Sequence, residues 1–394
     1  MKPEPPRPRS SFARRLVAVV ALIAFGGIVA LLLAEAVLRL VPIPGITYHS
    51  FYFDPVTGGT YYPNTTLIYR SAEGVEVVRH ANGWGFPDVD HALAPAPGTL
   101  RIGFFGDSYT EARQVTLEDT FFRRIGHDLS ARAAEFADEK NTRGEPVTRV
   151  EAISFGITGR STLQSYLECS RWMEKSDLDV VVYVFVENDP GDQFPGIQPS
   201  DEVPLATLEG DSFAVDDSFN QRYARKTTWW HRSMQRIKAN SLVVSTLEGR
   251  LKLLKRHGVK RTVTPADRAG GAGGGGVPMV PSVWPAGKAD EGWELVERVL
   301  DRWHREVIAD GREFIIFRVP REEVVAVPLA EQDAWAPRLH DYCARRGIPL
   351  VDPTPLFVPP MAAGEAVYHD HFTPLGHRLF AQAFVDYWLA RDGR

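Results

Sequence analysis

Short apolar runs alternate with amphipathic stretches from about residue 100 to the end of this 394-residue chain. The apolar runs predict buried strands, because they are short and rich in β-branched and aromatic residues; they cover residues 101–105, 150–155, 180–186, 313–319 and 349–352. The amphipathic stretches predict helices over about 118–133, 161–174, 291–309, 329–346 and 376–391. Apolar strands that alternate with helices indicate a parallel sheet covered on both faces. With right-handed crossovers, the pattern predicts a doubly wound α/β fold with a five-stranded parallel sheet.

A different pattern opens the chain. Residues 16–34 carry no charge and are almost wholly apolar, which is close to the roughly 20 residues that a helix needs to cross a bilayer. Five basic residues and one acidic residue precede this run, so the positive-inside rule predicts a cytoplasmic N-terminus and an extracytoplasmic (periplasmic) remainder. Ala34-Glu35-Ala36 resembles a signal-peptidase site, and a cleaved signal peptide is the alternative. The length of the apolar run favours an uncleaved signal-anchor.

These patterns divide the chain into four parts. A basic cytoplasmic tail (1–15) and a transmembrane signal-anchor (16–40) precede a stalk or β-containing extension (41–98), and residues 99–394 form the α/β domain. The domain carries an insertion at about 191–290, with a predicted helix over 228–256. The glycine run at 269–278 lacks the Lys-Ser/Thr of a phosphate-binding loop and predicts a flexible linker.

Composition narrows the function classes. A hydrophobic content of 44% and nine tryptophans indicate a substantial core, and a net charge of −5 argues against a nucleic-acid partner. Cys169 and Cys343 are too few for a disulfide framework and have no zinc-site spacing, so we expect buried free thiols, with a single disulfide as the alternative in an exported protein. No dinucleotide fingerprint or metal-ligand spacing is present, so we expect neither cofactor nor metal. The sequence carries no signal for an oligomeric state.

Residues with catalytic chemistry follow the first three predicted strands. Ser108 comes directly after the first strand, on the turn into a helix, which is where open α/β sheets bind ligands. Taken alone, a serine there also fits an ordinary helix N-cap. Gly159 follows the second strand, and Asn188 follows the third. A backbone amide at a glycine and a side-chain amide are both suitable donors to an oxyanion.

A histidine-rich segment precedes the last predicted helix. His371 could serve there as the general base for a serine nucleophile. A neighbouring carboxylate, such as that of Asp370, would fix the tautomer of the base and stabilise the imidazolium. Metal binding by the clustered histidines is the less favoured interpretation, because no other ligands lie nearby in the sequence.

Four blocks together resemble the SGNH (GDSL-type) hydrolase superfamily. They occur in the order Gly106-Asp107-Ser108, Gly159, Asn188-Asp189 and His371-Phe372-Thr373-Pro374-Leu375-Gly376-His377. The anchored N-terminus and the phrase Asn82-Gly83-Trp84-Gly85-Phe86 are similar to membrane-anchored bacterial members. The resemblance implies a flavodoxin-like three-layer α/β/α sandwich with Ser108 as nucleophile and His371 as base. It also implies that the oxyanion donors are the amides of Ser108 and Gly159 and the side chain of Asn188.

The sequence departs from the family pattern at two places. Val186 stands where the asparagine block usually has glycine. The family places its catalytic Asp two or three residues before the His, but here those positions are His369 and Tyr368. We therefore expect the adjacent Asp370 to orient His371. A shifted register with His369 as the base, and a Ser-His dyad supported by a backbone carbonyl, are the alternatives.

Three functions fit these residues. The first is an extracytoplasmic serine esterase or deacylase that acts through an acyl-enzyme on an ester substrate, such as an O-acylated glycan or lipid. The second is an O-acyltransferase that passes the acyl group to an envelope polysaccharide. Exclusion of water by the insertion would favour transfer. The third is an inactive glycan-binding or assembly protein on the same fold.

Overall fold

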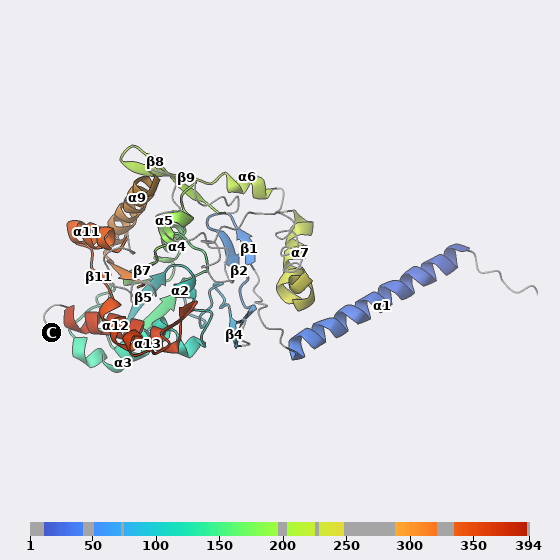
Figure 1. Cartoon of the computed structure of the whole chain (residues 1–394), viewed down its shortest axis with the longest axis horizontal. Coiled ribbons are helices and arrows are strands. Elements are labelled where there is room, and N and C mark those ends of the chain that lie inside the picture. Colours follow the sequence, from blue (N-terminus) through green and yellow to red (C-terminus); the bar gives the residue numbers. More distant parts are fainter. Residues whose placement is uncertain are drawn as a thin grey trace, which may run out of the picture.

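The computed structural model describes residues 12–41, 51–71, 75–195, 203–224, 228–247, 288–320 and 335–391. A long helix, α1 (Phe12–Leu40), projects from the body of the molecule (Figure 1). Its segment Arg14–Leu40 spans 27 residues, and the most apolar 18-residue stretch within it has a mean hydropathy of 3.0 and is not buried against the rest of the chain. By length and composition, it is the one helix among the described residues that could cross a membrane. Most of the predicted cytoplasmic tail and the glycine run at 269–278 lie outside the described residues.

The sheet has five parallel strands: β5 (Thr99–Phe105), β6 (Arg149–Ser154), β7 (Val180–Phe185), β10 (Glu313–Arg318) and β11 (Leu350–Val351). Their spatial order is β6-β5-β7-β10-β11, so the first strand lies between the second and the third. The prediction of a five-stranded parallel sheet is confirmed. In this flavodoxin-like order, the chain switches direction between β5 and β7, and their carboxyl ends border the crevice where such sheets bind ligands.

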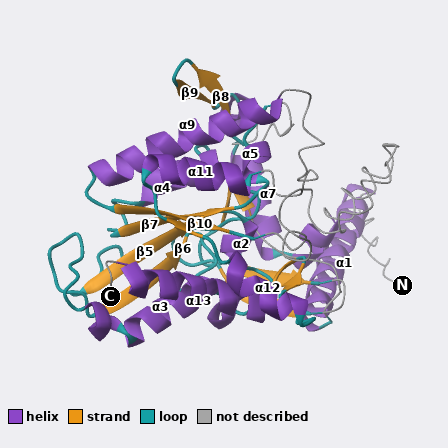
Figure 2. Cartoon of the chain, turned by 60° about the vertical axis from the view of Figure 1, so that its left-hand side comes forward, coloured by secondary structure: helices purple, strands orange, loops and turns teal. Residues whose placement is uncertain are grey.

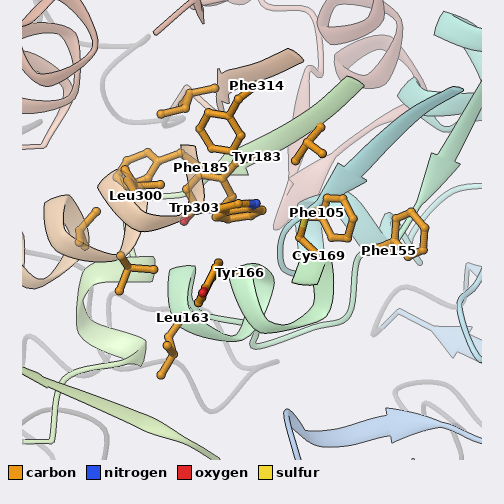
Figure 3. Packing of buried hydrophobic residues seen from close by; sticks show 14 of the residues in the cluster. Phe105, Phe155, Leu163, Tyr166, Cys169, Tyr183, Phe185, Leu300, Trp303 and Phe314 are labelled. Atoms are coloured by element: carbon orange, nitrogen blue, oxygen red, sulfur yellow. The ribbon is translucent and has the colours of Figure 1, made fainter. Parts of the chain in front are cut away.

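Helices cover both faces of the sheet (Figure 2). One face packs against α4 (Thr162–Trp172), α9 (Lys288–Ala309) and α11 (Ala336–Arg346). The other packs against α3 (Phe121–Ala131), α12 (Thr354–Ala362) and α13 (Pro374–Ala390). On the first face, Trp303 is 1% exposed and lies among aromatic side chains of β5 and β7 (Figure 3). The predicted three-layer α/β/α sandwich is confirmed.

Several helix boundaries follow from local capping. Ser161 and Gln164 form a capping box at the start of α4, and Gly347 ends α11 in the left-handed conformation. Part of the helix predicted over 329–346 lies outside the described residues; the described part is α11. Residues 248–256 of the helix predicted over 228–256 lie outside the described residues, and the described part is interrupted. Helix α7 (Trp229–Asn240) ends before Ser241, whose hydroxyl accepts from the Val244 amide and starts a short helix over 242–247.

The extension that precedes the sheet packs onto the domain. Its described residues form two antiparallel hairpins, β1 (Phe51–Asp54) with β2 (Gly58–Tyr61) and β3 (Thr66–Arg70) with β4 (Glu76–His80). The loop that follows carries His91, whose ring nitrogens lie 2.7 Å from Glu151 and 3.1 Å from Asp88. Glu151 also accepts from Arg101 at 2.7 Å. A buried ion-pair network therefore ties the extension to β5 and β6.

The described part of the insertion adds a hairpin, the helices α6 (Phe219–Ala224) and α7 and the short helix over 242–247 to the domain edge. The hairpin β8 (Leu205–Glu209) with β9 (Ser212–Asp216) packs on α9, and α6 and α7 follow. Cys169 and Cys343 are both buried free thiols, and burial raises the pKa of each above its usual value. The disulfide alternative is thus absent from the structure.

Candidate active site

Ser108 lies at the switch point, directly after β5. The carboxylate of Asp107 caps the short helix α2 (Ser108–Glu111) by accepting from the Tyr109 amide at 3.0 Å. Ser108 is therefore the first residue of the helix rather than its cap, and its hydroxyl has no capping role. The Ser108 Oγ instead lies 2.7 Å from Nε2 of His371. The two atoms are hydrogen-bonded at a distance expected between a serine nucleophile and its base.

A tight hairpin presents the histidine. Strands β12 (Tyr368–His369) and β13 (His371–Phe372) pair on either side of Asp370, whose φ of 66° lies in the left-handed region. Neighbouring side chains of an extended strand point to opposite faces. The left-handed residue at the hairpin tip allows both to converge: Nδ1 of His371 lies 3.0 Å from Oδ2 of Asp370. The structure thus joins Ser108, His371 and Asp370 in one chain of contacts.

The side chains of His371 and Asp370 differ in their exposure to solvent. The side chain of His371 is 16% exposed, whereas that of Asp370 is 58% exposed. The hydrogen bond from His371 lowers the pKa of Asp370, and the smaller effect of burial opposes it. The ring of Tyr109 packs on the imidazole at a centroid distance of 4.6 Å and helps to fix its orientation. Solvent therefore screens the carboxylate, but the base itself is largely shielded.

The other histidines of the segment have different surroundings. His369 is exposed, and it is His371 that contacts Ser108. His377 is buried in α13, where its ring stacks on Phe121 at 6.0 Å. Burial lowers the pKa of His377 to about 3, so this ring is neutral at ordinary pH. The geometry does not support the shifted register with His369 as base.

The predicted amide donors lie on α2 and on the loop after β6. Gly159 has a φ of 76°, with open space where a side chain would stand. Neither its N–H nor that of Ser108 donates to any group in the described part of the chain. An unpaired N–H at a helix N-terminus and another on an adjacent glycine loop are suited to an anionic oxygen. The two amides are therefore available for the role that the sequence predicts.

Glu111 holds the glycine loop against the nucleophile helix. Its buried carboxylate accepts from the Thr158 amide at 2.6 Å, from the Thr158 hydroxyl, and from the Tyr61 hydroxyl at 2.6 Å. Gly156 lies so close that an added Cβ would stand 2.4 Å from the Glu111 nitrogen. These contacts of Glu111 could not be predicted from the sequence, because Thr158 and Tyr61 lie 47 and 50 residues from it and no local pattern links them.

Asn188 is also held by a carboxylate that the sequence analysis missed. Its amide nitrogen donates to Asp192 at 2.7 Å and lies 3.4 Å from Asp107. The first and last residues of the short helix α5 (Asp189–Asp192) are both acidic. In the sequence, only the spacing of four residues between Asn188 and Asp192 could have indicated this contact. One N–H of Asn188 is thereby committed to Asp192, and the other points toward the weaker contact with Asp107.

Three carboxyl groups lie behind the nucleophile, on Asp107, Asp189 and Asp192. Burial is the largest cause that raises the pKa of each, and the negative charge of Asp107 raises those of the other two further. The pKa of Asp192 rises to about 7. A carboxyl group that is partly neutral repels a nearby anion less than a carboxylate does. No group of three or more His, Cys, Asp or Glu in the described ranges could hold a metal ion.

Comparisons with known proteins give only distant likenesses. No family model matches the chain, and no curated protein does. The acetyl xylan esterase AlAXEase is 14% identical, with a TM-score of 0.35 over 73% of this chain and 99% of its own. The lipase/acylhydrolase from Enterococcus faecalis is 13% identical, with a TM-score of 0.35 over 74% and 96%. A catalytic mutant of an acetylxylan esterase from Geobacillus stearothermophilus is 12% identical, with a TM-score of 0.37 over 76% and 98%.

Similarity of this size assigns no function to the present chain. The fold and the site define an α/β protein with a serine, a histidine and a carboxylate at the switch point of a parallel sheet. Two unpaired backbone amides and one side-chain amide belong to the same strand-end loops.

Proposed function

We propose that the protein is a serine esterase or deacylase that works through an acyl-enzyme. The observation that carries the proposal is the contact of 2.7 Å between Ser108 Oγ and Nε2 of His371, whose other nitrogen faces Asp370 at 3.0 Å. With a proton on Nδ1 donated to the carboxylate, Nε2 has a free lone pair to accept the serine proton. This tautomer of His371 is the one that activates a serine nucleophile.

The reaction follows from this arrangement. Ser108 Oγ attacks the ester carbonyl as its proton moves to His371, and the oxyanion accepts hydrogen bonds from the amides of Ser108 and Gly159. Asn188 becomes the third donor when its second N–H turns from the 3.4 Å contact with Asp107 to the oxyanion. The C–O bond to the alcohol breaks as His371 returns the proton to the leaving oxygen. Water then attacks the acyl-enzyme with His371 again as base, which releases the acid and restores Ser108.

The proposed site of action is the extracytoplasmic side of a membrane. This rests on α1, which is long and apolar enough to span a bilayer, and on the basic residues that precede its apolar run. An O-acylated glycan or lipid of the cell envelope is the substrate class that such an enzyme would meet.

The test uses the full chain in detergent with p-nitrophenyl acetate. Ser108→Ala should reduce turnover to the level of buffer, and a fluorophosphonate probe should label the wild type but not the variant. Ser170→Ala is the matched control, because the Ser170 hydroxyl bonds only its own helix, at Tyr166 O. Equal turnover by wild type and Ser108→Ala would refute the serine mechanism.

A second measurement separates hydrolysis from acyl transfer. The wild type is incubated with the same ester and an oligosaccharide acceptor, and the acceptor is analysed by mass spectrometry. We expect free acid and an unchanged acceptor. A gain of one acetyl group on the acceptor, absent with Ser108→Ala, would instead assign an O-acyltransferase on the same acyl-enzyme.

A further inference from the structure

Helix α7 exposes large apolar side chains at the domain edge. Trp229 is 79% exposed, Trp230 is 64% exposed and Ile237 is 50% exposed. Burying large apolar side chains is favourable, so two adjacent exposed tryptophans mark a surface that gains from a partner. Tryptophan is also the residue that favours the membrane–water interface, because its ring is apolar and its N–H is polar.

The C-terminal end of α7 is bonded to α1. Arg39 donates to the Asn240 carbonyl at 3.1 Å. Glu35 accepts from the Ser241 hydroxyl at 2.9 Å and from the amides of Leu242 and Val243 at 3.0 and 3.1 Å. The carboxylate of α1 thus caps the helix that follows α7. Figures 1 and 2 both show α7 on the side of the domain that faces α1.

The length of α1 sets the depth of this contact. The uncharged run ends at Ala34, and its 19 residues at about 1.5 Å each span about 28 Å, close to the ~30 Å hydrocarbon thickness of a bilayer. Glu35 is the first charged residue after the run, so it emerges at the headgroup level. The chain segment that is bonded to Glu35 therefore lies at that level too.

The charge of α7 fits an anionic lipid surface. Its sequence, WWHRSMQRIKAN, contains three basic residues and no acidic one. Tryptophan with lysine and arginine is the composition of helices that lie in the membrane interface. The exposed side chain of Arg236 is therefore placed to meet phospholipid headgroups.

We propose that α7 lies in the membrane interface on the side of the α/β domain, with Trp229 and Trp230 among the headgroups of anionic phospholipids. The contact holds the domain against the bilayer beside its own anchor. The proposal depends on α1 spanning a membrane and is independent of the esterase activity. It goes beyond anchoring by one helix, because it fixes which edge of the domain faces the lipid.

The experiment reconstitutes the full chain into vesicles of phosphatidylcholine and phosphatidylglycerol, with and without lipids brominated on the acyl chain. Bromine quenches tryptophan fluorescence only at short range. Trp229 and Trp230 are the two most exposed tryptophans among the described residues, so we expect strong quenching of the wild type. The double variant Trp229→Ala/Trp230→Ala should lose most of it. Trp335→Phe removes a 2%-exposed tryptophan and should leave the quenching in place.

Either of two outcomes would overturn the proposal. Equal quenching of the wild type and the double variant would mean that other tryptophans meet the lipid. An unquenched wild type would mean that this face binds something other than lipid, such as a protein partner. The double variant should turn over p-nitrophenyl acetate at the wild-type rate, because neither tryptophan contacts the site. Its activity therefore reports on folding, and the quenching reports on docking.

Discussion

The exposure of Asp370 predicts a moderate role for the carboxylate in catalysis. Removal of the carboxylate from a buried serine–histidine–carboxylate triad lowers kcat by about 10⁴-fold. Here the carboxylate side chain is 58% exposed, so water screens its charge and can replace its hydrogen bond to His371. We therefore expect Asp370→Asn to lower kcat far less than in a buried triad.

The magnitude follows from the geometry. A hydrogen bond to a charged group is worth about 1.5–3 kcal/mol when it is shielded from water. At 3.0 Å but half in solvent, the bond between Asp370 and His371 should be worth about 1–2 kcal/mol. At 1.36 kcal/mol per tenfold, that corresponds to a loss of about 5–30-fold in kcat, with KM little changed.

The assay is steady-state hydrolysis of p-nitrophenyl acetate by the full chain. Asparagine and glycine are the chosen replacements because both tolerate the φ of 66° at this position. Asp370→Gly should lose a similar amount of activity but gain stability. The left-handed conformation costs a non-glycine residue about 1 kcal/mol, and glycine adopts it without this cost. The matched control is Asp177→Asn, since Asp177 is also left-handed, at a φ of 51°, and pairs with Arg143. A loss above about 10³-fold, or below about twofold, contradicts the argument from exposure.

Two further predictions concern stability. Gly156→Ala should lower the free energy of unfolding by about 1–3 kcal/mol and also reduce kcat, because the new methyl would press on the backbone of Glu111 at 2.4 Å; Gly59→Ala, whose nearest contact would be 3.8 Å, is the control in urea unfolding. Burial opposes the charge on His91, but the hydrogen bonds of its two carboxylate partners prevail and raise its pKa to about 9. Its stabilisation is thus fully present below about pH 6.5 and is lost as the pH rises through 9, by at most about 3 kcal/mol. Burial alone would raise the pKa of Glu151, but the hydrogen bonds from His91 and Arg101 lower it to about 2. A second loss of stability should therefore appear as the pH falls from about 4.5 through 2. Urea unfolding across the pH range should show both slopes, and His91→Gln should flatten the alkaline one; an unchanged alkaline slope in that variant would refute the assignment.

The sequence predicted the sheet because buried parallel strands consist of short apolar runs. All five strands lie where the pattern places them, to within two residues. Helix ends were less predictable, because capping decides them: the hydroxyl of Ser241 starts a new helix inside a continuous amphipathic stretch. For the extension the sequence predicted only a stalk or a β-containing segment, since hairpins such as β1 with β2 are stabilised by packing on the domain rather than by their own periodicity.

The candidate site divides in the same way. The placement of Ser108, Gly159 and Asn188 after neighbouring strands could be predicted, because parallel strands bring their carboxyl ends to one edge of the sheet. His371 was reached through the motif that surrounds it. The sequence favoured Asp370 as the carboxylate that orients His371 but left two alternatives, because neighbouring side chains converge only if the backbone between them turns. The left-handed φ of Asp370 that produces this turn is set by the hairpin.

The sequence by itself determined the fold class, the order in which candidate catalytic residues follow the strands, and the apolar helix. Each of these depends on patterns that are local in the chain. Only the tertiary structure decided how the site is supported. Glu111 meets Thr158 and Tyr61, and Asp192 meets Asn188 beside Asp107, through contacts that mostly join distant segments. Such contacts depend on the close packing of loops at one sheet edge, and packing leaves no periodic trace in the sequence. The same reason applies to α7, whose place beside α1 is fixed by hydrogen bonds across about 200 residues.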